Sequence, residues 1–126
     1  MKILHLGYSD KSGGASIAMM RLHKSLKELG VQSNVLVGEK NTKDYDIFGP
    51  ETSLEKKVNN LKIKLARQKK YFYRHNGKYS HSLNIFSSKI IKKINKIKPD
   101  ILNLHWVNNK LISIKEISRL KIPIVW

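Results

Sequence analysis

The chain has 126 residues and a formal net charge of +16. It has room for one domain with one modest core, and its hydrophobic fraction of 40% is well above that of a disordered chain. The absence of cysteine excludes disulfides and thiolate metal sites and fits a reducing cytoplasm. We expect neither a signal peptide nor a membrane span, because the apolar run at residues 3–6 is short and no stretch approaches roughly 20 apolar residues.

The first elements predicted along the chain are a strand, a turn and a helix. Residues 1–8 are typical of a buried strand, and Gly13 and Gly14 follow in a polar loop where glycine permits positive φ and close backbone approach. Residues 15–29 carry apolar side chains at helical spacing, and Gly30 is a suitable helix stop. The expected buried face of this helix consists of Ala15, Ala18, Leu22, Leu26 and Leu29.

A second strand is predicted at residues 34–38 and a short third strand at residues 44–48. The order of strand, helix and strand predicts a parallel sheet. Residues 52–55 (Thr-Ser-Leu-Glu) match a capping box, which begins a helix over residues 54–72 with one apolar stripe. The rest of that helix is rich in basic residues, namely Lys56, Lys57, Lys62, Lys64, Arg67, Lys69 and Lys70.

The last part of the chain predicts two helices and two strands. An amphipathic helix over residues 90–97 ends before a proline, and residues 100–106 form a buried strand. A capping box at residues 113–116 begins a short helix, and residues 122–126 read as a final buried strand. The expected inward side chains of the short helix are Ile114, Ile117 and Leu120. The whole pattern predicts an α/β fold, a Rossmann-like parallel sheet with flanking helices.

Gly13 and Gly14 come first among the residues that could carry chemistry. A helix N-terminus presents unpaired N–H groups and a partial positive charge, which suit a phosphate. The sequence lacks the Gly-Lys-Ser/Thr ending of a P-loop and the third glycine of a dinucleotide fingerprint. A phosphate contact and a plain tight turn therefore both stay open.

His105 stands at the end of a predicted parallel strand, ahead of a polar loop. Ligands of open α/β sheets bind outside the carboxyl ends of the strands, where a histidine can act as a general base or hold a sugar hydroxyl. The alternative is a core histidine bonded to a carbonyl. Of the other histidines, His5 is expected to be packed, and surface positions are expected for His23, His75 and His81. No histidine pair has metal-ligand spacing, so we expect no metal site and no cofactor.

The high positive charge has several interpretations. It would attract nucleic acid, anionic lipid or phosphorylated substrates, or it is a matter of composition in a chain rich in lysine, isoleucine and asparagine. The basic helix at residues 54–72 either lies on a membrane surface or packs on its own domain with solvated lysines. The run at residues 71–74 (Tyr-Phe-Tyr-Arg) suits base stacking, but no nucleic-acid motif accompanies it, so nucleic acid is not an expected partner.

Two segments resemble a known family. Residues 2–38 (KILHLGYSDKSGG to NVLVG) and residues 99–126 (PDILNLHWVNN to IPIVW) are similar to parts of family 4 glycosyltransferases, which are retaining enzymes with two Rossmann-like domains in the GT-B fold. The likeness is strongest to members that build bacterial surface polysaccharides, and it is weak over residues 42–88. It implies that residues 1–126 are an incomplete N-terminal, acceptor-side domain and that a C-terminal donor-binding domain is absent.

The resemblance also implies roles for single residues. Gly13 and Gly14 would lie against the donor phosphates and the acceptor. His105 would be catalytic, pointing into the interdomain cleft near the transferred sugar, and Asn108 and Asn109 would lie near the acceptor. The implied reaction moves a sugar from a nucleoside-diphosphate-sugar to a lipid-linked or polysaccharide hydroxyl, in the cytoplasm or peripherally on the inner face of the plasma membrane.

Other hypotheses stay open beside the transferase. The chain could be a non-catalytic basic α/β module that binds anionic membrane or nucleic acid. It could also be an inactive, truncated remnant whose sheet is left with an open edge. Because the resemblance implies a second domain for donor binding, residues 1–126 alone are not expected to catalyse transfer.

Overall fold

The computed structural model describes residues 1–50, 57–58, 61, 89–107 and 111–126. Several predicted features lie outside these residues: the capping box at residues 52–55, residues 71–74, His75, His81, Asn108, Asn109, Lys56, Lys62, Lys64, Arg67, Lys69 and Lys70. Within the predicted basic helix, Lys57, Val58 and Leu61 are helical and their side chains are exposed.

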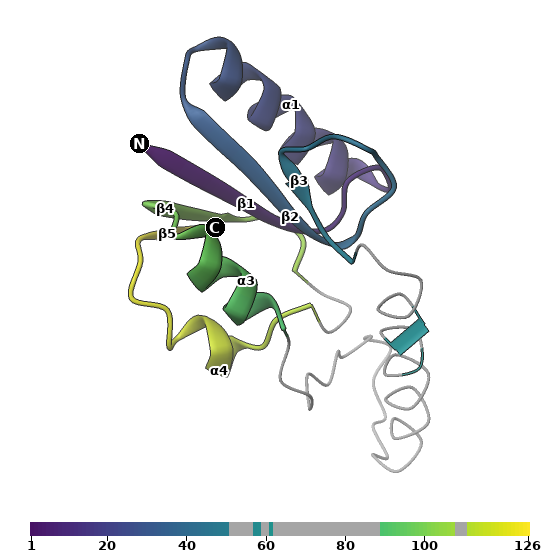
Figure 1. Ribbon diagram of the computed structural model, residues 1–126, viewed down its shortest axis with the longest axis vertical. Coiled ribbons are helices and arrows are strands. Elements are labelled where there is room, and N and C mark those ends of the chain that lie inside the picture. The colour runs from purple at the N-terminus through teal and green to yellow at the C-terminus, as the bar shows by residue number, and fades with distance from the viewer. Residues whose placement is uncertain (51–56, 59–60, 62–88, 108–110) are drawn as a thin grey trace, which may run out of the picture.

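The described strands form one parallel sheet in the order β3-β2-β1-β4-β5 (Figure 1). Their bounds are β1 Lys2–Ser9, β2 Gln32–Glu39, β3 Ile47–Phe48, β4 Ile101–Leu104 and β5 Ile124–Val125. Helix α1 (Gly14–Glu28) lies on one face of the sheet, and α3 (Ile90–Ile97) and α4 (Ile114–Ile117) lie on the other (Figure 1). The predicted α/β fold, a Rossmann-like parallel sheet with flanking helices, is confirmed.

The two faces of the sheet bury different chemistry. The face toward α3 is aliphatic, and its buried cluster is Leu4, Leu6, Leu36, Ile94, Leu102, Leu104, Val107, Leu111 and Ile112. The face toward α1 has a smaller apolar cluster of Met19, Val35, Val37 and Ile47. Buried polar side chains accompany that smaller cluster, among them His5, Ser16, His23 and Ser33. One face therefore serves mainly as core, while the α1 face holds titratable and hydroxyl groups.

The bounds predicted for α1 are correct to within a residue, but the predicted buried face is wrong. Its buried side chains are Ser16, Met19 and His23, whereas the expected Leu22 and Leu29 are 40% and 78% exposed. The expected Ala15 and Ala18 are exposed as well, and Leu26 is half-buried. His23 turns inward because the sheet beneath it offers Ser33 Oγ, which lies 2.8 Å from His23 Nδ1. The surface position expected for His23 is therefore wrong too.

Close packing holds α1 to the sheet at Gly7. A Cβ atom at residue 7 would lie 2.8 Å from the Sδ atom of Met19, closer than real Cβ atoms come to a neighbour. Because Gly7 has no side chain, Met19 can sit directly on β1.

The C-terminal elements lie where the sequence predicts them, but some of their side chains are more exposed than predicted. The capping box is present, because the Ser113 Oγ atom accepts from Glu116 N–H at 3.2 Å and Glu116 Oε2 accepts from Ser113 N–H at 2.9 Å. Ile117 and Leu120 pack on the core as expected, but Ile114 is 79% exposed. The final strand is not buried, because β5 is the edge of the described sheet. Val125 and Trp126 are accordingly exposed.

Candidate functional site

A hollow of about 460 Å³ opens at the carboxyl ends of β1 and β4. It is lined by Gly7, Tyr8, Ser9, Ser12, Gly13, Gly14, Ala15, Ser16, Met19, His105 and Trp106. The strand order changes direction here, because β1 leads through α1 to β2 on one side while β4 lies on the other side. Open α/β sheets bind their ligands at such a switch point.

Main-chain hydrogen bonds hold the two strand ends together beneath the hollow. The His105 N–H donates to the Leu6 carbonyl at 2.9 Å, and the Tyr8 N–H donates to the Trp106 carbonyl at 3.0 Å. The rings of Tyr8 and Trp106 pack edge to face, with centroids 5.9 Å apart. The two strands therefore continue to pair past the end of β4, which fixes the positions of His105 and Trp106 relative to β1.

The glycine turn forms the wall of the hollow that belongs to α1. Gly13 has φ 91° and ψ 162°, a region that only glycine adopts readily. A Cβ atom at Gly13 or Gly14 would meet nothing within 4 Å, so the space beside the turn is open. Since Gly13 has no side chain to cap the helix, the first N–H groups of α1 are left for another acceptor.

Asp10 anchors the loop that carries this turn. Its carboxylate accepts hydrogen bonds from the main-chain N–H groups of Asn41 and Thr42 and from Thr42 Oγ1, at 2.7 to 3.0 Å. Burial by itself would raise the pKa of Asp10, but the hydrogen bonds from Thr42 and Asn41 outweigh it and hold that pKa below its usual range. Ser9 Oγ accepts from the Ser12 N–H at 3.2 Å. The loop after β1 is thus tied to the loop after β2.

Ser16 stands in the first turn of α1 and is one of the residues that line the hollow. The residue is only 5% exposed, and its Oγ atom has no hydrogen-bond partner within the part of the chain that the structure describes. A buried polar atom without a partner costs roughly 1–3 kcal/mol, so such atoms usually receive one from a ligand or water. The hydroxyl is therefore suited to a polar ligand in the hollow.

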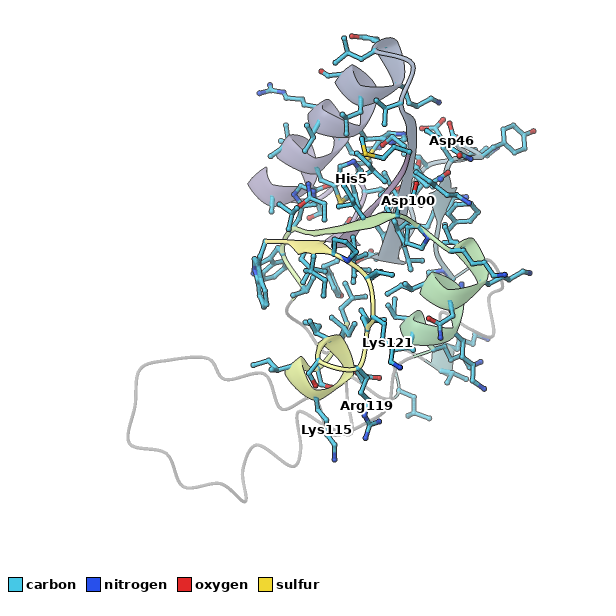
Figure 2. The ribbon with its side chains drawn as sticks, turned by 90° about the vertical axis from the view of Figure 1, so that its left-hand side faces the viewer. His5, Asp46, Asp100, Lys115, Arg119 and Lys121 are labelled. Carbon is cyan, nitrogen blue, oxygen red and sulfur yellow. The ribbon has the colours of Figure 1, made fainter. Side chains whose placement is uncertain are left out.

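The side chain of His105 is hydrogen-bonded through its Nε2 atom to a second histidine, His5. His5 Nδ1 lies 3.2 Å from His105 Nε2, and the ring centroids are 5.4 Å apart. His5 is fully buried and lies between α1 and the sheet (Figure 2). His23 follows it at 6.2 Å, ring edge to ring face. The three imidazoles form a column that leads from the hollow into the core under α1.

The burial of this column keeps its members neutral at neutral pH. Burial, together with the smaller effects of the neighbouring His105 and His23, lowers the pKa of His5 to about 4. Burial likewise lowers the pKa of His105 below its usual value. For His23 burial is again the main cause of a lowered pKa. A neutral imidazole carries one N–H donor and one lone pair, so the contact between His5 and His105 needs a donor from one ring and a lone pair from the other.

The structure brings together three of the residues singled out in the sequence, because Gly13, Gly14 and His105 all line the hollow. The predicted Asn108 and Asn109 lie outside the described residues. Sequence reasoning missed Ser16, the anchoring role of Asp10 and the contact between His5 and His105. A histidine and an aspartate within and directly after the first strand were the available signals, but their partners are distant in the chain.

Across the ranges given above, no cluster of three or more histidine, cysteine, aspartate or glutamate side chains could hold a metal ion. None of the helices seen there is long and apolar enough to cross a membrane. No protein-family model matches the chain, and searches of curated proteins and of solved structures find no significant match.

Proposed function

We propose that this chain is the acceptor-side, N-terminal domain of a retaining glycosyltransferase that uses a nucleoside-diphosphate-sugar. The observation that carries the proposal is the hollow at the β1/β4 switch point, where a helix N-terminus, the His105 imidazole and Ser16 meet; the Ser16 hydroxyl has no hydrogen-bond partner among the residues that the structure describes. These groups suit a ligand that is anionic at one end and rich in hydroxyl groups at the other.

The phosphate end of such a ligand fits the wall formed by α1. The N–H groups at Gly14 and Ala15 have no helical acceptor, and the helix dipole adds roughly half a positive charge at this end. Ser16 Oγ supplies a further donor, and the glycine turn leaves room for the phosphate oxygens. During transfer, negative charge builds on the departing diphosphate, and donors fixed in advance stabilise it.

The sugar end fits the opposite wall, at His105 and Trp106. His105 offers a ring nitrogen to a sugar hydroxyl or to the oxygen being transferred. Trp106 is 47% exposed, and its ring packs edge to face with that of Tyr8. An exposed aromatic ring suits the C–H face of a pyranose ring.

The acceptor in this proposal is a lipid-linked or polysaccharide hydroxyl, used in cell-surface polysaccharide synthesis at the cytoplasmic side of the membrane. Positive charge supports contact with an anionic membrane surface. Besides Lys57, exposed basic side chains occur on and after α4, where Lys115 and Arg119 extend outward and Lys121 follows (Figure 2). Exposed Ile114 on the same short helix adds apolar area.

The test is a titration of ¹⁵N-labelled residues 1–126 with inorganic pyrophosphate, UDP-glucose and GDP-mannose, followed by amide chemical shifts. We expect shifts concentrated at Gly13, Gly14 and Ala15, and binding weakened at least fivefold by Ser16→Ala. The matched control is Ser25→Ala, an exposed serine near the other end of the same helix.

Two outcomes would overturn the proposal. One is the absence of shifts at the glycine turn with all three ligands. The other is binding that follows anionic charge alone, spread over the basic surface, equal for heparin and pyrophosphate and insensitive to Ser16→Ala. The second outcome would favour the non-catalytic basic module.

A further inference from the structure

The contact between His5 and His105 joins two neutral imidazoles, so only one of the facing nitrogens can carry a proton. The atoms concerned are His5 Nδ1 and His105 Nε2, 3.2 Å apart. Either His5 donates and His105 accepts, or the reverse. The two arrangements leave His105 in opposite tautomers, because a neutral imidazole that accepts at Nε2 carries its proton on Nδ1.

The far side of His5 distinguishes the two arrangements. Its Nε2 atom is buried and has no hydrogen-bond partner among the residues that the structure describes. If His105 donated, His5 would carry its own proton on Nε2, as a buried N–H without an acceptor. If His5 donates from Nδ1, its Nε2 atom is a lone pair only. Buried N–H groups without an acceptor are rarer in proteins than buried acceptors without a donor.

We propose that His5 is a positioning residue that holds His105 with its proton on Nδ1, so that His105 offers the hollow a hydrogen-bond donor and not a base. The lone pair of His105 is occupied by the proton of His5, so the Nδ1–H is the polar ring group that remains for a ligand in the hollow that His105 lines. The group that it meets is an oxygen acceptor, such as a phosphate, carbonyl or hydroxyl oxygen.

His105 thereby receives a specific role in the proposed function. The identity of the ligand rests on that proposed function. His105 orients a ligand oxygen and stabilises negative charge on it, and it takes no proton from an attacking hydroxyl. The position of the proton itself depends only on the His5–His105 pair. It can therefore be measured without any ligand.

The experiment is a long-range ¹H–¹⁵N correlation spectrum of the histidine rings in ligand-free residues 1–126 at neutral pH. His105→Gln identifies the His105 signals by their disappearance. We expect His105 with Nδ1 protonated and Nε2 unprotonated, which is the tautomer that free histidine in water disfavours. The proton on Nε2 of His105 in the unmodified chain would overturn the proposal.

Two variants of His5 extend the test. His5→Asn places an amide N–H close to the position of Nδ1 and should preserve the His105 tautomer. His5→Leu removes the donor and should return His105 to the Nε2–H form, whereas His23→Asn, which alters a buried histidine without a hydrogen bond to His105, should not. A folded His5→Leu variant with an unchanged His105 tautomer would contradict the proposal. The spectrum of the unmodified chain decides the matter if that variant does not fold.

Because no ligand is present, failure of this experiment and failure of the binding titration are distinct results. A His105 donor without amide shifts at the glycine turn for any of the three ligands would remove the proposed function and leave the positioning role of His5. Specific binding at the glycine turn, with His105 protonated on Nε2, would support the proposed function and remove the positioning role of His5.

Discussion

The carboxylate of Asp10 accepts two hydrogen bonds from Thr42, one from its main-chain N–H at 2.8 Å and one from its Oγ1 atom at 2.7 Å. Asp10 directly follows β1, and Thr42 lies in the loop that follows β2. This pairing fixes the start of the loop that carries Gly13 and Gly14. The shape of the hollow therefore depends on a residue that does not line it.

Replacement of Asp10 with alanine should destabilise the fold and loosen the glycine turn. It leaves the N–H groups of Asn41 and Thr42 without their acceptor, at a cost of about 2 kcal/mol in the free energy of unfolding. Urea denaturation measures the loss. The control is Asp44→Ala, which changes an exposed aspartate in the loop after β2, the loop that also holds Thr42. Equal stability of the two variants would show that Asp10 does not anchor the loop.

The two adjacent glycines should respond differently to alanine. Gly13→Ala should lower the free energy of unfolding by about 1–3 kcal/mol, because φ 91° and ψ 162° strain any residue with a Cβ atom. Gly14→Ala should leave it unchanged or raise it by up to about 1 kcal/mol, because Gly14 is helical and has open space beside it. Thermal and urea unfolding measure both variants. A loss that is the same at both positions would contradict the geometry of the turn.

Acid should weaken the fold through His5. Its folded-state pKa of about 4 lies below the ordinary 6.5, so protonation favours the unfolded chain. The stability that neutral His5 contributes is present above about pH 6.5 and is lost as the pH falls toward 4, by roughly 3 kcal/mol. Urea unfolding at a series of pH values measures the slope. His5→Asn, which does not titrate here, should flatten it, and an unchanged slope would assign it to other groups.

Much of the fold followed from local patterns. The helix predicted at residues 90–97 is α3, and the predicted capping box at residues 113–116 begins α4, since helical spacing and capping depend on neighbours in the chain. The positions of Gly13, Gly14 and His105 at strand ends also followed, because the carboxyl ends of parallel strands lie at one edge of a sheet. Burial was predicted less well, as Leu22, Ile114 and the final strand illustrate.

The sequence by itself determined the alternation of strands and helices, the parallel sheet and the place of the glycine turn, because each of these depends on spacing over a few residues. Only the tertiary structure decided which face of α1 is buried, because that depends on Gly7 and Ser33 in the strands beneath it. It alone decided that His5 meets His105, 100 residues further along the chain. Such a contact depends on which strands become neighbours and which faces their side chains share, and no local pattern records either.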